Sequence, residues 1–299
     1  YAIRYSGQPS SSKFQYYAME SCRIEPSVNL DFKTGERLLP LRLRSLYQDV
    51  GYPIPLLYVV DAANFPIATQ GLQLFVAPRG GYNYAGARVL DISGFGRHGL
   101  LNSDFATVWQ LTLGTSLVKA LLFDGVNDQC DFGDVCDLGA TDNYMMEGWF
   151  RISAADATLT TILSKKTDNV VGSVGFMITR TAANTIEFRV SNGTTQYTPT
   201  TTGTLLQNTW KHFAIVFPKG GNAQTYLNGV ADGTPVAVAA SHDASNALSL
   251  FLGRLGTAGF GNAAVGGFRL YNYNTATIPT DIATIISNHY SAERAFFGV

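Results

Sequence analysis

The chain has 299 residues, only 14% of them charged, and its 21 basic residues nearly balance 22 acidic ones. This length allows one large β domain or two ordinary domains. The balanced charge gives no footprint for nucleic-acid binding, and no acidic run indicates a disordered tail. Thr, Asn, Ser, Gly and Tyr are plentiful instead, as is common in extracellular proteins and virus particles.

The cysteines and the apolar segments exclude two further classes of protein. The three cysteines, Cys22, Cys130 and Cys136, are too few and odd in number for a disulfide-stapled scaffold. We interpret them as buried free thiols, with a local Cys130–Cys136 bridge as the alternative. The most apolar region, residues 54–78, is interrupted by Asp61 and three prolines, so it does not predict a membrane span.

Residues 1–69 differ from the rest and predict an N-terminal arm or small β subdomain. Residues 38–44 alternate apolar and basic side chains, a pattern typical of a half-buried strand. Residues 54–60 are a second candidate, which Pro55 favours as an edge strand. We expect this region to dock onto a partner or mediate oligomerisation; the alternative is an extension folded against its own domain. The predicted docking residues are Arg37, Arg42 and Arg44.

Residues 70–299 predict a single β domain. Apolar or alternating segments of strand length recur there, separated by Gly, Asn and Asp turns. About a dozen strands with short connections favour a two-sheet sandwich over an α/β fold. The expected strands include residues 72–76, 120–123, 144–152, 175–180, 185–190, 194–197, 210–217, 224–227, 247–252 and 267–271.

The turn signals within this domain are strong. Asn228-Gly229 lies between Q-T-Y-L and V-A-D-G, and a type I′ hairpin turn needs positive φ at both central residues. We therefore predict a hairpin there. Asn192-Gly193 and residues 182–184 predict two further turns between strands.

One helix is expected at the C-terminal end. Thr280 is a suitable N-cap because its hydroxyl can accept a hydrogen bond from a free backbone amide. Ile282, Ile285, Ile286 and Tyr290 follow at i, i+3, i+4 and i+8, so they share one face of a helix.

The strand and turn sequences occur in the order typical of one family. Residues 71–299 resemble a laminin-G-like, concanavalin A-type lectin–glucanase domain, of the kind found in phage and microbial surface proteins. The resemblance implies an antiparallel jelly-roll sandwich. One departure is Gly266-Gly267, where the family often has Asp-Glu, so contacts of those carboxylates are not carried over. The matching pieces are residues 71–74 (G-L-Q-L), 91–99 (D-I-S-G-F-G-R-H-G), 120–128 (A-L-L-F-D-G-V-N-D), 146–150 (M-E-G-W-F), 162–165 (I-L-S-K), 210–214 (W-K-H-F-A), 226–230 (Y-L-N-G-V), 252–254 (L-G-R) and 268–272 (F-R-L-Y-N).

The same architecture hosts glycoside hydrolases, so catalysis has to be weighed. Such hydrolases place two glutamates on one strand in an E-x-D-x-E pattern, and a retaining pair lies about 5 Å apart. None of the six glutamates here has that spacing. Only Glu147 and Glu187 fall in predicted strands, and each lacks an acidic neighbour. We therefore expect no catalytic residues and no enzymatic activity.

Four aspartates form the best candidate for a metal site. Asp124, Asp128, Asp131 and Asp134 gather in one loop-rich segment, and hard oxygen ligands suit Ca²⁺. Their spacing is not that of an EF-hand, and Asp124 followed by glycine fits a turn. We favour turn chemistry and expect no cofactor, with Ca²⁺ as the alternative. The four histidines show no metal-ligand spacing.

Exposed aromatic rings are the candidates for sugar binding. Trp149 and Trp210 lie in alternating strands and are expected in the core. The predicted sugar-binding residues are Trp109, which lies in a loop-like stretch, and Tyr82, Tyr84 and Tyr197.

Two functions fit these observations. The first is a non-enzymatic structural protein at a phage virion surface: a capsid decoration, cement, spike or tail component. It would contact other virion proteins or further copies of itself, and its jelly roll would bind host glycan weakly. The alternative is a secreted or cell-surface carbohydrate-binding or adhesion module of a microbe, which needs an export signal before Tyr1. Neither involves nucleic acid or membrane insertion.

Overall fold

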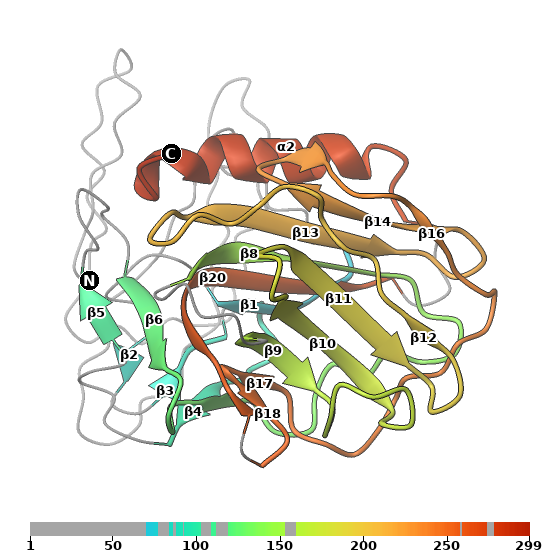
Figure 1. Cartoon of the computed structure of the whole chain (residues 1–299), viewed down its shortest axis with the longest axis horizontal. Helices are drawn as coiled ribbons and strands as arrows, with labels where there is room; N and C mark the ends of the chain where they lie inside the picture. The colour runs from blue at the N-terminus through green and yellow to red at the C-terminus, as the bar shows by residue number, and fades with distance from the viewer. Residues whose placement is uncertain are drawn as a thin grey trace, which may run out of the picture. The chain divides into compact units, whose positions relative to one another are not determined.

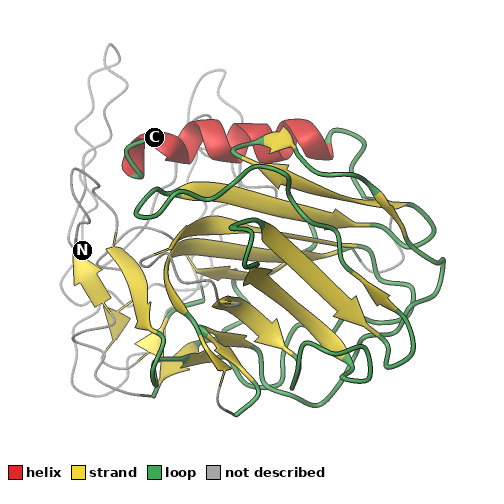
Figure 2. Cartoon of the chain, in the orientation of Figure 1, coloured by secondary structure: helices red, strands yellow, loops and turns green. Residues whose placement is uncertain are grey.

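The computed structural model describes residues 70–76, 84–85, 88–91, 93–102, 109–111, 119–152, 160–257, 259–273 and 278–299. These residues form two antiparallel sheets packed face to face and one C-terminal helix (Figure 1, Figure 2). The predicted all-β sandwich is therefore confirmed. The predicted arm, residues 1–69, and its docking residues Arg37, Arg42 and Arg44 lie outside the described residues.

The first sheet has nine strands in the described part of the chain. The strands β1 (Leu72–Val76) and β16 (Val236–Ala237) pair with β20 and β14 respectively. The other strands, in spatial order, are β15 (Val230–Ala231), β14 (Asn222–Leu227), β13 (Lys211–Phe217), β8 (Tyr144–Ile152), β20 (Asn262–Asn272), β6 (Lys119–Asp124) and β5 (Trp109–Leu111).

The second sheet also has nine strands among the described segments. A small separate hairpin joins β18 (Arg254–Leu255) to β19 (Gly259–Phe260). The nine strands, in spatial order, are β12 (Gln196–Tyr197), β11 (Ile186–Ser191), β10 (Gly175–Arg180), β9 (Thr160–Lys165), β17 (Phe251–Leu252), β7 (Cys130–Asp131), β4 (Gly99–Leu101), β3 (Arg88–Val89) and β2 (Tyr84–Ala85).

Strand β8 contributes side chains to two separate buried clusters, one on each face of the first sheet. Because side chains alternate along a strand, Met146 and Phe150 lie in the core between the sheets. Trp149 lies on the opposite face of β8, in a separate buried cluster. Each fully buried side chain of this size contributes about 1.5–3 kcal/mol of transfer free energy. The strand is buried on both faces, so its apolar pattern is nearly continuous rather than alternating.

The C-terminal segment explains the burial of that outer face. Helix α2 (Ile282–Glu293) and the 3₁₀ helix η1 (Arg294–Phe296) lie over the first sheet, beside β13 and β14 in Figure 1. The ring of Phe297 stacks on Trp149 with centroids 4.0 Å apart. Trp149 and Trp210 are buried as predicted, but under this segment rather than between the sheets.

The predicted helix is confirmed, but its predicted cap is wrong. The helix begins at Ile282, and Asp281 rather than Thr280 holds the N-cap position, without a side-chain hydrogen bond to the backbone. Of the predicted apolar face, Ile286 is fully buried in a cluster with Met145 and Tyr271.

The Gly266-Gly267 departure has a packing explanation. A β-bulge interrupts the pairing of β20 with β8 between Val265 and Gly267. A Cβ added at Gly266 would lie 2.3 Å from Cε1 of Phe297. The glycine therefore leaves room for the aromatic ring that anchors the C-terminus.

The predicted turns are present. Asn228 and Gly229 both have positive φ, 51° and 78°, and connect the paired residues Leu227 and Val230. The loop that contains Gly193, with φ of 92°, joins β11 to β12. Cys130 and Cys136 are free and buried, as interpreted from the sequence.

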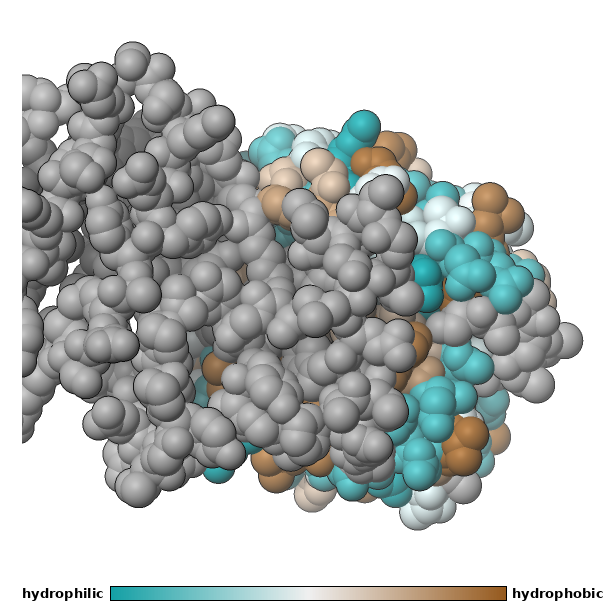
Figure 3. Space-filling model, turned by 90° about the vertical axis from the view of Figure 1, so that its left-hand side faces the viewer, coloured by the Kyte–Doolittle hydropathy of each residue, from teal (hydrophilic) through white to brown (hydrophobic). Residues whose placement is uncertain are grey.

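The described surface is mixed in character. Its exposed large apolar side chains are scattered over several elements. In the space-filling view, hydrophilic and hydrophobic residues alternate over the visible described surface (Figure 3). Within the described segments, no helix is long and apolar enough to cross a membrane. The exposed apolar residues are Phe95, Leu100, Val126, Val170, Val171, Leu206 and Val230.

Candidate functional site

The structure does not bring the predicted sugar-binding aromatics together. Tyr82 lies outside the described residues. Tyr84 and Trp109, described by their backbone alone, belong to strands of different sheets. Trp109 begins the edge strand β5, so its assignment to a loop is wrong. Of the four, only Tyr197 has a described side chain.

Tyr197 is half-buried and holds a loop in place. Its hydroxyl accepts a hydrogen bond from the backbone amide of Ala239 at 3.0 Å. Its ring meets the ring of Phe217 at 5.9 Å and that of His242 at 4.8 Å, both edge-on. Tyr197 therefore packs against His242 and does not present an open ring face on which a sugar could stack.

Three of the four clustered aspartates act as turn acceptors. Oδ1 of Asp124 accepts hydrogen bonds from the amides of the two residues after Gly125, at 2.7 and 3.3 Å. Asp128 accepts from the amide of Asp124 at 3.1 Å, and Asp131 from that of Gly133 at 2.7 Å. In the described part of the chain, no group of three or more His, Cys, Asp or Glu side chains is arranged to hold a metal.

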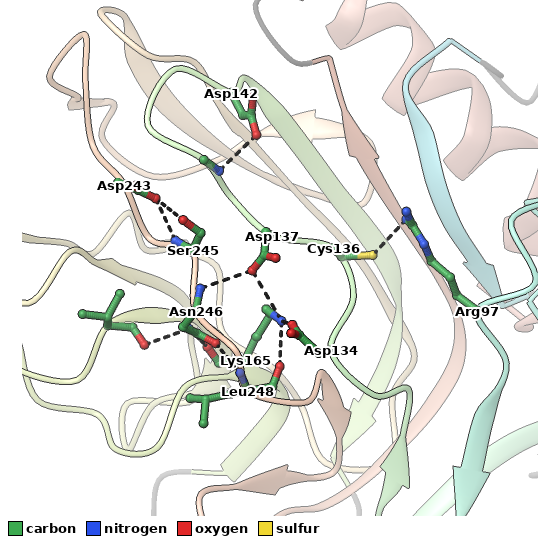
Figure 4. A network of polar contacts seen from close by, with 12 residues as sticks. Arg97, Asp134, Cys136, Asp137, Asp142, Lys165, Asp243, Ser245, Asn246 and Leu248 are labelled. Carbon is green, nitrogen blue, oxygen red and sulfur yellow. Dashed lines mark hydrogen bonds and ion pairs between the residues drawn. The ribbon is translucent and has the colours of Figure 1, made fainter.

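Asp134, the fourth, belongs to a different arrangement centred on Lys165 (Figure 4). The side chain of Lys165, at the end of β9, is 0% exposed. Its Nζ lies 2.5 Å from Oδ1 of Asp134, 2.6 Å from the carbonyl oxygen of Leu248 and 3.5 Å from Oδ1 of Asp137. A buried ammonium is costly unless it is paired and hydrogen-bonded, and these three oxygens compensate it.

Two loops supply these partners. The loop between β7 and β8 provides Asp134 and Asp137, and the loop between β16 and β17 provides Asn246 and Leu248. Backbone hydrogen bonds join the loops at 2.9 and 3.0 Å. The amide of Asn246 donates to Asp137 at 3.2 Å, and its side chain donates to the carbonyl oxygen of Lys165 at 3.0 Å. The loops are therefore tied to each other and to β9.

We call the carboxylates at this end of the sandwich the acidic rim: Asp134, Asp137, Asp142 and Asp243. Side chains of Asp134 and Asp137 are 51% and 49% exposed although one of their oxygens is anchored on Lys165. Hydrogen bonds from the hydroxyl and amide of Ser245 lower the pKa of Asp243. Its carboxylate is therefore ionised at neutral pH.

Lys165 and His242 near the rim are buried, and Lys219 is partly buried. Burial lowers the pKa of Lys219 to about 8, against the opposing charges of Asp142 and Asp243. Its Nζ donates to the carbonyl oxygen of His242. Burial, and then the charge of Lys219, lower the pKa of His242, so that ring is neutral at pH 7.

A second polar cluster lies under helix α2, and no motif or spacing in the sequence indicates it. Arg269 on β20 contacts Oε1 of Glu147 at 3.2 Å and also pairs with Glu293 of the helix. His289 lies 2.6 Å from Glu147, and the indole of Trp149 donates to Glu293 at 2.6 Å. Glu147 and Glu293 thus converge on one guanidinium although they are far apart in sequence.

The protonation of Glu147 follows from its surroundings. Burial by itself would raise the pKa of this carboxyl. The charge of His289, the close contact of His289 Nδ1 and the approach of His212 Nε2 to within 3.5 Å, and then the charge of Arg269 hold its pKa well below 4.5. Glu147 is therefore a buried carboxylate at neutral pH. Glu187, the other predicted strand glutamate, pairs with Arg189 on the outer face of β11.

The fold is a lectin-type jelly roll, and the loops at one end of the sandwich carry the acidic rim. Residues 124–283 match the Concanavalin A-like lectin/glucanases superfamily, and the chain belongs to that family. Comparison with curated proteins found no matching sequence.

Several solved structures share the fold at low sequence identity. The binding domain of botulinum neurotoxin serotype D aligns with a TM-score of 0.55 and 12% identity over 77% of this chain and 53% of that chain. The same toxin domain in complex with N-acetylneuraminic acid has a TM-score of 0.53 at 12% identity, over 77% of this chain and 53% of that one. The binding domain of Paraclostridial Mosquitocidal Protein 1 has a TM-score of 0.53 at 15% identity, over 73% and 52%. This chain spans about half the length of these structures.

Proposed function

We propose that this chain is a non-enzymatic carbohydrate-binding domain and that the acidic rim contacts the sugar. The observation that carries the proposal is the pair of half-exposed carboxylates, Asp134 and Asp137, each anchored through one oxygen on the buried ammonium of Lys165. No hydrogen bond joins the other oxygen, Oδ2, of either side chain to the described residues, so each can accept a hydrogen bond from a sugar hydroxyl. A hydrogen bond to a charged group contributes about 1.5–3 kcal/mol.

The rigidity of the rim supports binding. A site whose side chains are already held in place loses less conformational entropy when it binds. Asp137 is held by Lys165 and by the amide of Asn246. Asp243 is held by Ser245. The carboxylates are thus ordered before a ligand arrives.

The comparisons support the class of ligand. The family includes lectins, and one structural neighbour is a toxin domain in complex with N-acetylneuraminic acid. Fold analogy alone does not establish a function, so the argument rests on the rim. No comparison points to a virion protein, and the comparisons favour a secreted or cell-surface microbial module over the phage structural role.

The burial of the glutamates supports a non-catalytic role. Glu147 and Glu293 converge, but their side chains are 0% and 2% exposed under helix α2. A glycosidase needs two carboxyl groups flanking an accessible sugar, one with a raised pKa that acts as the acid. The pKa of Glu147 is lowered instead. Neither carboxylate reaches solvent where a glycan would bind.

A glycan array followed by calorimetry tests the proposal on the full chain. The double variant Asp134→Asn, Asp137→Asn should bind the best glycan at least about tenfold more weakly, since two charged acceptors are lost. The matched control is Asp281→Asn, an exposed aspartate before helix α2. Unchanged affinity in the double variant, an equal loss in the control, or cleavage of the bound glycan would each overturn the proposal.

A further inference from the structure

Two Asn-Gly dipeptides lie in turns of the sandwich, Asn192-Gly193 between β11 and β12 and Asn228-Gly229 between β14 and β15. An asparagine followed by glycine can react with its own backbone, because the amide nitrogen of the glycine can attack Cγ of the asparagine side chain. Glycine favours this attack since it has no Cβ and allows a close approach of the backbone. The two dipeptides contain the same reacting groups, so the fold around each one decides whether it reacts.

The side chain of Asn192 is polarised for such an attack. Its Oδ1 accepts hydrogen bonds from the amides of Thr194 and Thr195 at 3.0 and 2.8 Å, and from the hydroxyl of Thr194 at 3.0 Å. Three donors on one carbonyl oxygen stabilise the negative charge that develops there when a nucleophile adds to Cγ, as an oxyanion hole does. Both threonines are exposed, so the loop is open to water, the second reactant.

The nucleophile at this site has a proton acceptor beside it. The backbone amide of Gly193 donates a hydrogen bond to Oγ of Ser191 at 3.1 Å. The hydroxyl of Ser191 itself donates to the carbonyl oxygen of Val171, which leaves a lone pair of Oγ for the amide. The hydroxyl can therefore relay the amide proton while the nitrogen attacks.

The second dipeptide is held differently. Oδ1 of Asn228 accepts a hydrogen bond from the amide of His212 at 3.2 Å, and the backbone amide of Asn228 donates to the carbonyl oxygen of His212 at 2.7 Å. Gly229 is buried under helix α2, where an added Cβ would lie 2.9 Å from Cβ of Tyr290 and 3.2 Å from Cα of Ser287. The ring that the attack forms would need this backbone to turn against the helix, and burial keeps water away from it.

We propose that Asn192 is a site of spontaneous deamidation in the folded chain, and that the fold protects the same dipeptide at Asn228. In the first step the bond between N of Gly193 and Cγ of Asn192 forms, the Cγ–Nδ2 bond breaks, and ammonia leaves with the amide proton of Gly193. Water then adds to one of the two carbonyl carbons of the resulting succinimide and opens the ring, which gives aspartate or isoaspartate. The reaction consumes one water, releases one ammonia and is independent of sugar binding.

Peptide mapping by mass spectrometry of the full chain, incubated at physiological temperature and neutral pH, tests the proposal. In the native chain Asn192 should be converted at least about tenfold faster than Asn228, a difference of about 1.4 kcal/mol in activation free energy. The chain unfolded in urea is the matched control, where the two sites should react at similar rates because their different contacts are lost. Equal native rates, or a native Asn192 that stays unmodified while both sites react in urea, would overturn the proposal.

The Ser191→Ala variant tests the relay of the proton. Loss of the hydroxyl should slow the deamidation of Asn192 several-fold in the native chain and leave its rate in urea unchanged. If Ser191 only held the loop in place, its removal would free the loop and speed the reaction. An unchanged or faster native rate therefore contradicts the role of the hydroxyl, and if the variant does not fold, the native and urea rates of the wild type decide.

Discussion

Removing the guanidinium of Arg269 is expected to destabilise the domain strongly. Its side chain is 3% exposed and lies between Glu147 and Glu293, which are 0% and 2% exposed. The substitution Arg269→Met preserves apolar volume but leaves two buried carboxylates without their cation. Removing one partner of a buried ion pair typically costs about 3–5 kcal/mol. For a domain of this size each kcal/mol lowers Tm by about 2–4 °C, so a decrease of about 6–20 °C is expected.

Urea denaturation followed by tryptophan fluorescence measures this loss directly, since Trp149 donates to Glu293 in the same cluster. The matched control is Arg294→Met, an exposed arginine at the end of the same helix, which should change the free energy of unfolding by less than about 1 kcal/mol. Limited proteolysis should cut helix α2 faster in the Arg269 variant only. A loss below about 1 kcal/mol for Arg269→Met, or one equal to that of the control, would refute the role given to this cluster.

Three further outcomes follow. The pKa of Glu147 is lower in the fold than its ordinary 4.5, so the stability that its ionised carboxylate contributes is complete above that pH and is lost as pH falls below it. Urea denaturation at stepped pH should show this decline in the free energy of unfolding of the wild type. A flatter pH profile in the wild type than in Glu147→Gln would be inconsistent with this expectation. At Gly175, φ is +127° and an added Cβ would lie 2.0 Å from the carbonyl oxygen of Lys165, whereas an added Cβ at Gly172 would have no atom within 4 Å. Thermal denaturation should therefore show a Tm loss of several degrees for Gly175→Ala and little change for Gly172→Ala. Equal effects of the two substitutions would contradict the close approach at Gly175. Phe297→Ala removes the ring stacked on Trp149 and should cost about 3–5 kcal/mol in urea, with a loss under about 1 kcal/mol as the contrary result.

Local signals in the sequence predicted the local structure well. The Asn228-Gly229 turn depends on the φ preference of two adjacent residues, so the dipeptide alone indicates it. Thr280 failed as a cap because the helix starts at Ile282, which places Asp281 at the cap position. Trp109 was misplaced because a three-residue edge strand is too short to show an alternating pattern.

The polar sites depend on contacts that no local pattern contains. Lys165 meets Asp134 across 31 positions of sequence, and Arg269 meets Glu147 across 122. These long-range contacts depend on strand register and on the path of the C-terminal segment. In the sequence, Asp134 is one of four clustered aspartates. In the structure the other three accept hydrogen bonds within turns, and only Asp134 contacts the buried Lys165.

Backbone NMR of the isotope-labelled chain, titrated with the best glycan from the array, tests most directly where the sugar binds. The shifts are expected to concentrate in residues 133–143 and 242–248, with Asp134 and Asp137 among the largest. Shifts centred on β10 and β11 or on helix α2, with those two loops unchanged, would contradict a carbohydrate site at the acidic rim.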